Sequence, residues 1–252
     1  MIYPQAVIYK KTKAMDYSAV INCIYLDEDT KFSDTHEPYM YGDLEAPTFR
    51  PDEGISRAEG AMVLLRIFGE NYTNVKTITT KYSDIEDTYY VARQAITKAT
   101  QLNIMSGYPD GSFKPNGKMT RAEFMRVIAS YVAESADKKG LELKDTDALV
   151  IYKNTSNKNH WSNPYVTLLA RLNMTNASSK EKDLRVDETI TRAEVAQLCN
   201  FYLFRAPAKV TSSTNMQFTD VNRSHKLIGD IVEATRESHS YMVTSDGKEV
   251  IK

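Results

Sequence analysis

A short pattern that occurs three times constrains the fold of this chain more than any other feature of its sequence. It reads ISRAE at 55–59, MTRAE at 119–123 and ITRAE at 190–194. The three arginines, Arg57, Arg121 and Arg192, are 64 and 71 residues apart, and each stands eight residues after an apolar residue. Similar segments at such spacings indicate that the chain is built from repeated structural units.

The pattern belongs to a longer unit. The three copies read TFRPDEGISRAE at 48–59, SFKPNGKMTRAE at 112–123 and DLRVDETITRAE at 183–194, which predicts an extended lead-in, a polar turn and a helix start. GYPDG precedes the second copy, where Pro109 and Gly111 suit the second and fourth positions of a type I turn. About 37 residues ahead of the second and third arginines, a capped loop leads into an amphipathic helix. The full unit is therefore predicted to be helix, turn, helix.

The first copy has no such leading helix, because its window KFSDTHEP is polar and contains a proline. The missing pattern follows the third copy instead, as FTDVNRSHKLIGDIVEATRESH at 218–239. We therefore predict a mainly α fold, a pseudo-threefold ring of three helix-turn-helix repeats around a central three-helix bundle, with the first repeat completed by the C-terminal helix. The predicted domain covers 32–252, with repeat 1 at 32–79 completed by 209–252, repeat 2 at 80–150 and repeat 3 at 151–208. Residues 1–31 are expected to be an N-terminal extension or the end of an upstream domain.

The helices that follow the three arginines should pack through matching apolar faces. Counted from each arginine, positions four, seven and eleven are apolar and fall on one face of a helix. These positions are Ala61, Leu64 and Phe68, then Met125, Ile128 and Val132, then Ala196, Cys199 and Leu203. Cys199 is therefore expected to be a buried, unreactive thiol.

Each arginine sits inside the signature of a capping box, with a serine or threonine before it and a glutamate two residues after it. Capping does not explain the arginine itself, because a cation in the first turn faces the positive end of the helix dipole. Two explanations stay open: an intramolecular carboxylate such as Asp84 or Asp220, or an external anion, which a guanidinium can bind through two hydrogen bonds. Since the arginine shares the face of the apolar positions, it should emerge in a sheltered crevice between units.

Composition and motifs exclude several functions. The formal net charge of −1 and the pI near 6.5 argue against nucleic acid or an anionic membrane as a partner. No apolar run is long enough to cross a bilayer, and the first thirty residues lack the ordered regions of a signal peptide. Cys23 and Cys199 are not spaced as a disulfide scaffold or a zinc site, and we predict no catalytic residue and no cofactor. Surface or capping roles are expected over metal binding for the isolated histidines, His36, His160, His225 and His239.

Together these motifs resemble three tandem surface-layer homology (SLH) repeats, a bacterial cell-wall anchoring domain. The combination of GYPDGSFKP with TRAE in the second copy is the most specific part of a resemblance that extends over about 32–239. It implies a three-pronged helical domain that binds secondary cell-wall polysaccharide non-covalently, often through a pyruvylated terminal sugar, in grooves between adjacent units. It also implies a non-catalytic protein of the bacterial cell surface or surface layer, with its signal peptide removed or encoded upstream.

Carried over by position, the resemblance implies a set of ligand-binding residues in these grooves. They are Arg57, Arg121, Arg192, Asp84, Asp220, Gly107, Tyr108, Asn154 and Trp161. The third copy departs from the pattern, because Asn154 stands at the aspartate position and no GYPDG precedes the copy. The grooves are therefore expected to be unequal, with those that use the second copy better formed. For Trp161, packing under a neighbouring loop is expected ahead of stacking on a sugar ring.

Two other classes of function stay open. The same grooves would also suit a structural module for surface-layer or protein–protein assembly. An enzyme acting on wall glycan is the third class, although a glycosidase pair cannot be picked out of the many carboxylates without their separation.

Overall fold

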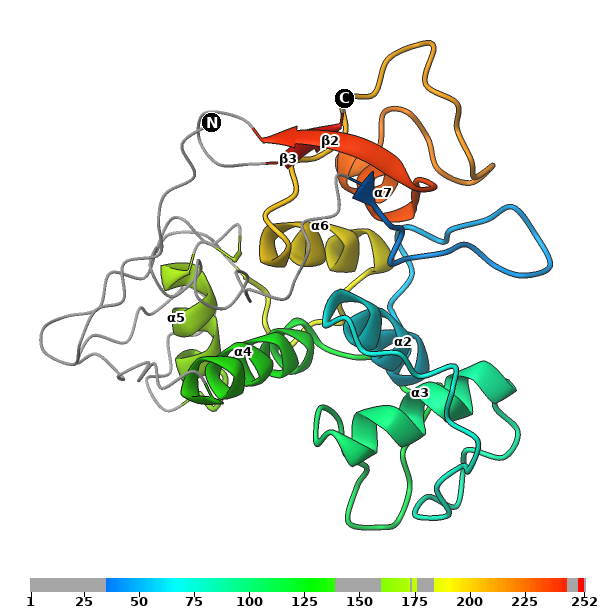
Figure 1. Ribbon diagram of the computed structural model, residues 1–252, viewed down its shortest axis with the longest axis vertical. Coiled ribbons are helices and arrows are strands. Elements are labelled where there is room, and N and C mark those ends of the chain that lie inside the picture. Colours follow the sequence, from blue (N-terminus) through cyan, green and yellow to red (C-terminus); the bar gives the residue numbers. More distant parts are fainter. Residues whose placement is uncertain (1–34, 139–159, 173, 176–183, 244–248, 252) are drawn as a thin grey trace, which may run out of the picture.

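The computed structural model describes residues 35–138, 160–172, 174–175, 184–243 and 249–251, and helices dominate that part of the chain (Figure 1). The helices are α2 Arg57–Ile67, α3 Tyr90–Gln101, α4 Arg121–Lys138, α5 Asn163–Arg171, α6 Arg192–Tyr202 and α7 Ile228–Thr235. Three short strands, β1 Thr35–His36, β2 His239–Val243 and β3 Glu249–Ile251, form an antiparallel sheet in that order. The mainly α class is confirmed, and the small sheet is an addition that the sequence did not predict. The proposed extension at 1–31 lies outside the described residues.

Capping boxes start the three helices that follow the repeated pattern, as predicted. In α2 and α6 the N-caps are Ser56 and Thr191, and each exchanges hydrogen bonds with the glutamate three residues later. In α4 the backbone N–H of Thr120 donates to Glu123 Oε2 at 2.8 Å, and the backbone N–H of Glu123 donates to Thr120 Oγ1 at 3.2 Å. Each helix therefore begins at the repeated arginine because the cap fixes the chain just before it.

A closed cycle of backbone hydrogen bonds joins the three copies. Ile55 donates to the carbonyl of Ile190 at 3.1 Å, Ile190 donates to Met119 at 3.0 Å, and Met119 donates to Ile55 at 3.1 Å. We call these three residues the hub, and all three side chains are buried. The first N–H of each helix, which has no partner within its own helix, donates to a carbonyl of another copy. The starts of α2, α4 and α6 are thus held together by main-chain bonds.

The other three helices pack in pairs with these. Contacts join α2 with α3, α4 with α5, and α6 with α7, so each outer helix lies against the copy that precedes it in the chain (Figure 1). The predicted apolar positions of α2, α4 and α6 are buried, except that Leu203 is only partly buried. Cys199 is fully buried, and burial raises the pKa of its thiol well above the ordinary value, which confirms the predicted inert thiol. In the described part of the chain, no helix has both the length and the apolar character needed to cross a membrane.

An aspartate clip ties the C-terminal segment to the first copy. The carboxylate of Asp220 accepts the backbone N–H groups of Phe49 and Arg50 at 2.8 and 2.7 Å. Asp84 binds the second copy in the same way, through Phe113 and Lys114, both at 2.8 Å. Arg50 and Lys114 have φ of 57° and 56°, a left-handed conformation that costs a non-glycine residue free energy. The carboxylate offsets this cost because it accepts two neighbouring N–H groups at once.

Replacing Asp220 with alanine should lower the free energy of unfolding by roughly 1–2 kcal/mol, because two backbone donors lose a charged acceptor. Urea denaturation followed by circular dichroism measures the loss. Asp87→Ala is the matched control, since Asp87 is exposed. Equal losses in the two variants would contradict the clip.

Candidate functional site

The three repeated arginines are enclosed between copies, as predicted. Their exposed fractions are 8% for Arg57, 8% for Arg121 and 4% for Arg192. Arg57 Nε donates to the carbonyl of Phe113 at 2.8 Å, and Arg192 Nε donates to that of Phe49 at 2.6 Å. Each guanidinium therefore reaches from the start of its own helix to the lead-in of another copy.

In two of the three positions a glutamate of the capping box neutralises the arginine. Arg121 Nη2 contacts both carboxylate oxygens of Glu194, at 2.7 and 2.6 Å, and Arg192 Nη1 contacts Glu59 Oε1 at 3.0 Å. The expected intramolecular carboxylates, Asp84 and Asp220, were therefore the wrong candidates: they bind backbone N–H groups instead. A capping glutamate can do both tasks because one carboxylate has more acceptor positions than the cap uses.

These ion pairs lower the pKa values of Glu59 and Glu194. Burial opposes ionisation of Glu59, but Arg192, the N–H of Ser56 and Arg50 outweigh it and hold the pKa below its ordinary value. Burial likewise opposes ionisation of Glu194, and Arg121 with the N–H of Thr191 lowers the pKa. Both carboxylates therefore stay charged at neutral pH.

Arg57 is different from the other two. It donates from Nε to Phe113 and from Nη2 to the carbonyl of Ser106 at 2.7 Å, and it makes no ion pair with any residue that the structure describes. Its Nη1 has no hydrogen-bond partner among those residues. This atom is not buried and is therefore open to solvent. The guanidinium carbon lies 4.9 Å from the ring centre of Tyr108 and 4.8 Å from that of Phe113. We call Arg57, Tyr108, Phe113 and Lys114 the Arg57 site.

Two side-chain differences accompany this asymmetry: Gly117 stands where the other copies have Glu53 and Glu188, and Lys114 stands where they have arginine. Arg50 and Arg185 follow the apolar residue of the first and third copies, and each also contacts the capping glutamate, at 2.7 Å. Lys114 holds the same place in the second copy, where its Nζ lies 4.2 Å from the ring centre of Tyr108 and 3.8 Å from Asp110. Lysine lacks the planar, many-donor group that lets arginine join two acceptors. Glu123 is consequently held by its cap, and no contact joins it to Arg57.

The turn that carries Tyr108 lies where the sequence predicts one. The backbone N–H of Gly111 donates to the carbonyl of Tyr108 at 3.1 Å, which closes a four-residue turn over Pro109. A Cβ atom on Gly107 would lie 2.3 Å from the ring of Tyr82 and 2.4 Å from the carbonyl of Ser112, so only glycine fits. Tyr108 keeps 37% of its surface exposed beside the buried Arg57. The structure thus brings Arg57, Gly107 and Tyr108 together, with Asp84 clipping the backbone behind them.

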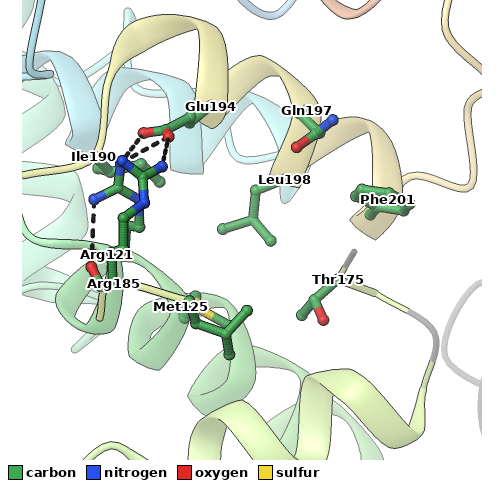
Figure 2. Close-up of a pocket in the computed structure, with 10 residues that line it drawn as sticks. Arg121, Met125, Thr175, Arg185, Ile190, Glu194, Gln197, Leu198 and Phe201 are labelled. Carbon is green, nitrogen blue, oxygen red and sulfur yellow. Dashed lines mark hydrogen bonds and ion pairs between the residues drawn. The ribbon is translucent and has the colours of Figure 1, made fainter. Parts of the chain in front are cut away.

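A pocket lies between α4 and α6, next to Arg121 (Figure 2). Figure 2 shows Arg121 and Arg185 converging on Glu194 at one end, while Met125, Leu198 and Phe201 lie along the remaining wall. The lining residues are Arg121, Met125, Thr175, Leu184, Arg185, Ile190, Glu194, Gln197, Leu198 and Phe201. Its cations are already paired, so this pocket offers mainly apolar surface.

The remaining predicted site residues belong to the third copy. Trp161 is 48% exposed, so the expected packing under a neighbouring loop is wrong; its ring stacks beside His160 at 5.8 Å on the surface. His160 bonds to Ser162 and Asp187, and His225 bonds to Asp52 and to the N–H of Leu227, so these two have the expected capping roles. Asn154 lies outside the described residues.

The fold and the site define a mainly helical protein in which three similar helix starts each enclose an arginine. Residues 81–125, which contain the second copy, match the family of the S-layer homology domain. This match confirms the resemblance for that copy, whereas three tandem repeats stay a prediction.

Relatives extend the similarity over most of the chain. Cell surface glycoprotein 1 of Acetivibrio thermocellus is 30% identical over 220 residues, which cover 86% of this chain and 9% of that protein. The cellulosome-anchoring protein of the same organism is 30% identical over 218 residues, 86% of this chain and 46% of that protein. A surface layer protein of Brevibacillus choshinensis is 31% identical over 94 residues, 37% of this chain and 8% of that protein. The chain thus spans less than half the length of these relatives.

Acid should weaken the fold through Glu59 and Glu194. The pKa values of both glutamates are lowered in the folded state. Their contribution to the free energy of unfolding is therefore fully present above the ordinary glutamate pKa, and it is lost as the pH falls through the pKa of the folded state. The double variant Glu59→Gln/Glu194→Gln keeps the caps and should show a flatter loss of thermal stability below about pH 4.5. Glu86→Gln, at an exposed position, is the control. If the double variant loses thermal stability below this pH as steeply as the unchanged chain, the result would count against these ion pairs.

Proposed function

We propose that this chain is a non-catalytic module that anchors its parent protein to the bacterial cell wall by binding secondary cell-wall polysaccharide. The observation that carries the proposal is the Arg57 site, where a nearly buried arginine makes no ion pair within the described part of the chain. Two relatives support it, since one is named a cellulosome-anchoring protein and another a surface layer protein. In this proposal the chain lies on the cell surface, and its partner is wall glycan.

The chemistry of the site suits an acidic sugar. Arg57 Nη1 is available for a carboxylate, such as the ketal carboxylate of a pyruvylated sugar, and Lys114 adds a second cation at the rim. The exposed ring of Tyr108 offers an apolar face beside these charges. A pyruvylated terminal sugar combines one anion with an apolar ring face, so it matches both features.

The three positions are not equivalent in this proposal. Arg121 and Arg192 already bind glutamates, so an incoming carboxylate has to displace an internal partner there. Arg57 needs no such exchange. We therefore propose one strong site at Arg57 and weaker sites at the other two arginines, within three repeats that occupy 32–252.

Calorimetric titration with a short pyruvylated wall fragment should show one site that saturates at a lower fragment concentration than the other two. Three equal sites would contradict the proposed ranking. The same titration with the fragment after chemical removal of pyruvate should show little heat, because the anion is gone.

Sedimentation with purified cell walls should separate the roles of the arginines. Arg57→Ala should weaken wall binding by roughly 10- to 100-fold, the value of a lost charged hydrogen bond. Arg121→Ala and Arg192→Ala should weaken it less. Arg126→Ala, which removes an exposed arginine of α4, should have no effect.

Lys114→Arg provides a test that leaves Arg57 in place. The new arginine should draw Glu123 toward Arg57, as Arg50 and Arg185 hold the other capping glutamates, and wall binding should fall while the fold is kept. Wall binding that survives pyruvate removal and replacement of all three arginines by alanine would overturn this mechanism and favour an assembly module. Release of soluble sugar from walls would instead indicate an enzyme.

A further inference from the structure

Two histidines and a glutamate meet outside the Arg57 site, where β1 pairs with β2 near the two ends of the described chain. His36 of β1 and His239 of β2 are direct partners across the antiparallel pair, and Glu233 belongs to α7. All three side chains are buried, with exposed fractions of 4%, 9% and 1% respectively. The sequence predicts isolated histidines on the surface or in caps, and for His36 and His239 this prediction is wrong.

The geometry of this cluster is that of converging ligand atoms. One nitrogen of each imidazole and a carboxylate oxygen of Glu233 all lie within 4.8 Å of one another. His36 Nδ1 is 2.7 Å from Glu233 Oε1, and His239 Nε2 is 3.4 Å from the same oxygen. The second of these distances is close to the edge of a tetrahedron of nitrogen and oxygen ligands around zinc, about 3.3 Å for bonds of about 2.0 Å.

The hydrogen bonds of His239 fix which nitrogen carries its proton. Its Nδ1 lies 3.0 Å from the carbonyl oxygen of Glu237, which can only accept, so Nδ1 is the donor. Nε2 of the neutral ring then presents a lone pair toward an oxygen that also only accepts. In a metal-binding histidine, the ring nitrogen that does not bind the metal usually donates its proton to a carbonyl or carboxylate oxygen.

Two atoms of the cluster are enclosed and lack a hydrogen-bond partner among the described residues: His239 Nε2 and Glu233 Oε2. Buried polar atoms without partners are costly, so two of them on neighbouring members of one cluster call for a shared partner. A proton between His239 and Oε1 leaves Oε2 unsatisfied, whereas a metal ion can accept lone pairs from both carboxylate oxygens. Arg205 does not supply the partner, because its Nη1 is 4.0 Å from Oε1 and donates to the carbonyl of Glu37.

We propose that His36, Glu233 and His239 bind one divalent transition-metal ion, with Zn²⁺ as the expected occupant. Two imidazoles and one carboxylate are a zinc ligand set, and they leave a fourth position for water. When the ion binds, the distance between His36 Nδ1 and Glu233 Oε1 increases from that of a hydrogen bond to that between two ligand atoms of one ion. The ion ties β1 to β2 and α7, and so fastens the first described strand to the C-terminal part of the chain.

Metal titration of the purified chain after dialysis against a chelator tests this site. One equivalent of Zn²⁺ should remain bound after gel filtration and should raise the melting temperature, since a ligand of the folded state stabilises it. Ca²⁺ and Mg²⁺ should do neither, because they prefer all-oxygen sites. Failure of the wild-type chain to retain Zn²⁺ overturns the proposal without any variant.

Variants assign the ion to its ligands. His36→Gln and His239→Gln should each weaken Zn²⁺ binding at least about tenfold, the scale on which even outer-shell partners act. His160→Gln, which removes an imidazole from the third copy, should leave binding unchanged. Co²⁺ bound in place of Zn²⁺ should give the visible bands of a tetrahedral site without a thiolate band. A thiolate band, or full binding in the double variant His36→Gln/His239→Gln, would overturn the assignment.

Discussion

The cycle of main-chain hydrogen bonds through Ile55, Met119 and Ile190 is the constraint on which the remaining structure depends. Each hub residue gives one hydrogen bond and receives one, so the cycle closes with no residue left over. The capped helix start follows two residues later in every copy, and its first N–H groups are satisfied by another copy. The direction of each helix, and hence the position of each repeated arginine, is therefore set by the hub.

This arrangement explains how a cation can occupy the first turn of three helices. The positive end of a helix dipole disfavours arginine, but the guanidinium extends away from its own helix to a carbonyl of another copy. In two positions a capping glutamate adds a full negative charge. Folding thus accounts for Arg121 and Arg192, while Arg57 makes no ion pair among the described residues.

The sequence predicted the features that follow from local rules, and it missed those that depend on distant pairing. Capping boxes, helix starts and the buried faces of α2, α4 and α6 each rest on residues a few positions apart, and they are confirmed. The second role of Glu59 and Glu194 was missed because capping was already a sufficient reason for them. The cluster of His36 and Glu233 was missed because 197 positions separate its members, and no spacing rule spans that distance.

Divergence between copies carries more information about function than their similarity does. A residue that all three copies share has a common structural reason, as the capping glutamates show. Lys114 stands where the other copies have arginine, and there the capping glutamate makes no ion pair with the enclosed arginine. His36 and His239 likewise lie at the contact between the segment before the first copy and the C-terminal segment. The Arg57 site and the histidine cluster are therefore local departures from a shared frame, and both require that frame to hold distant segments in contact.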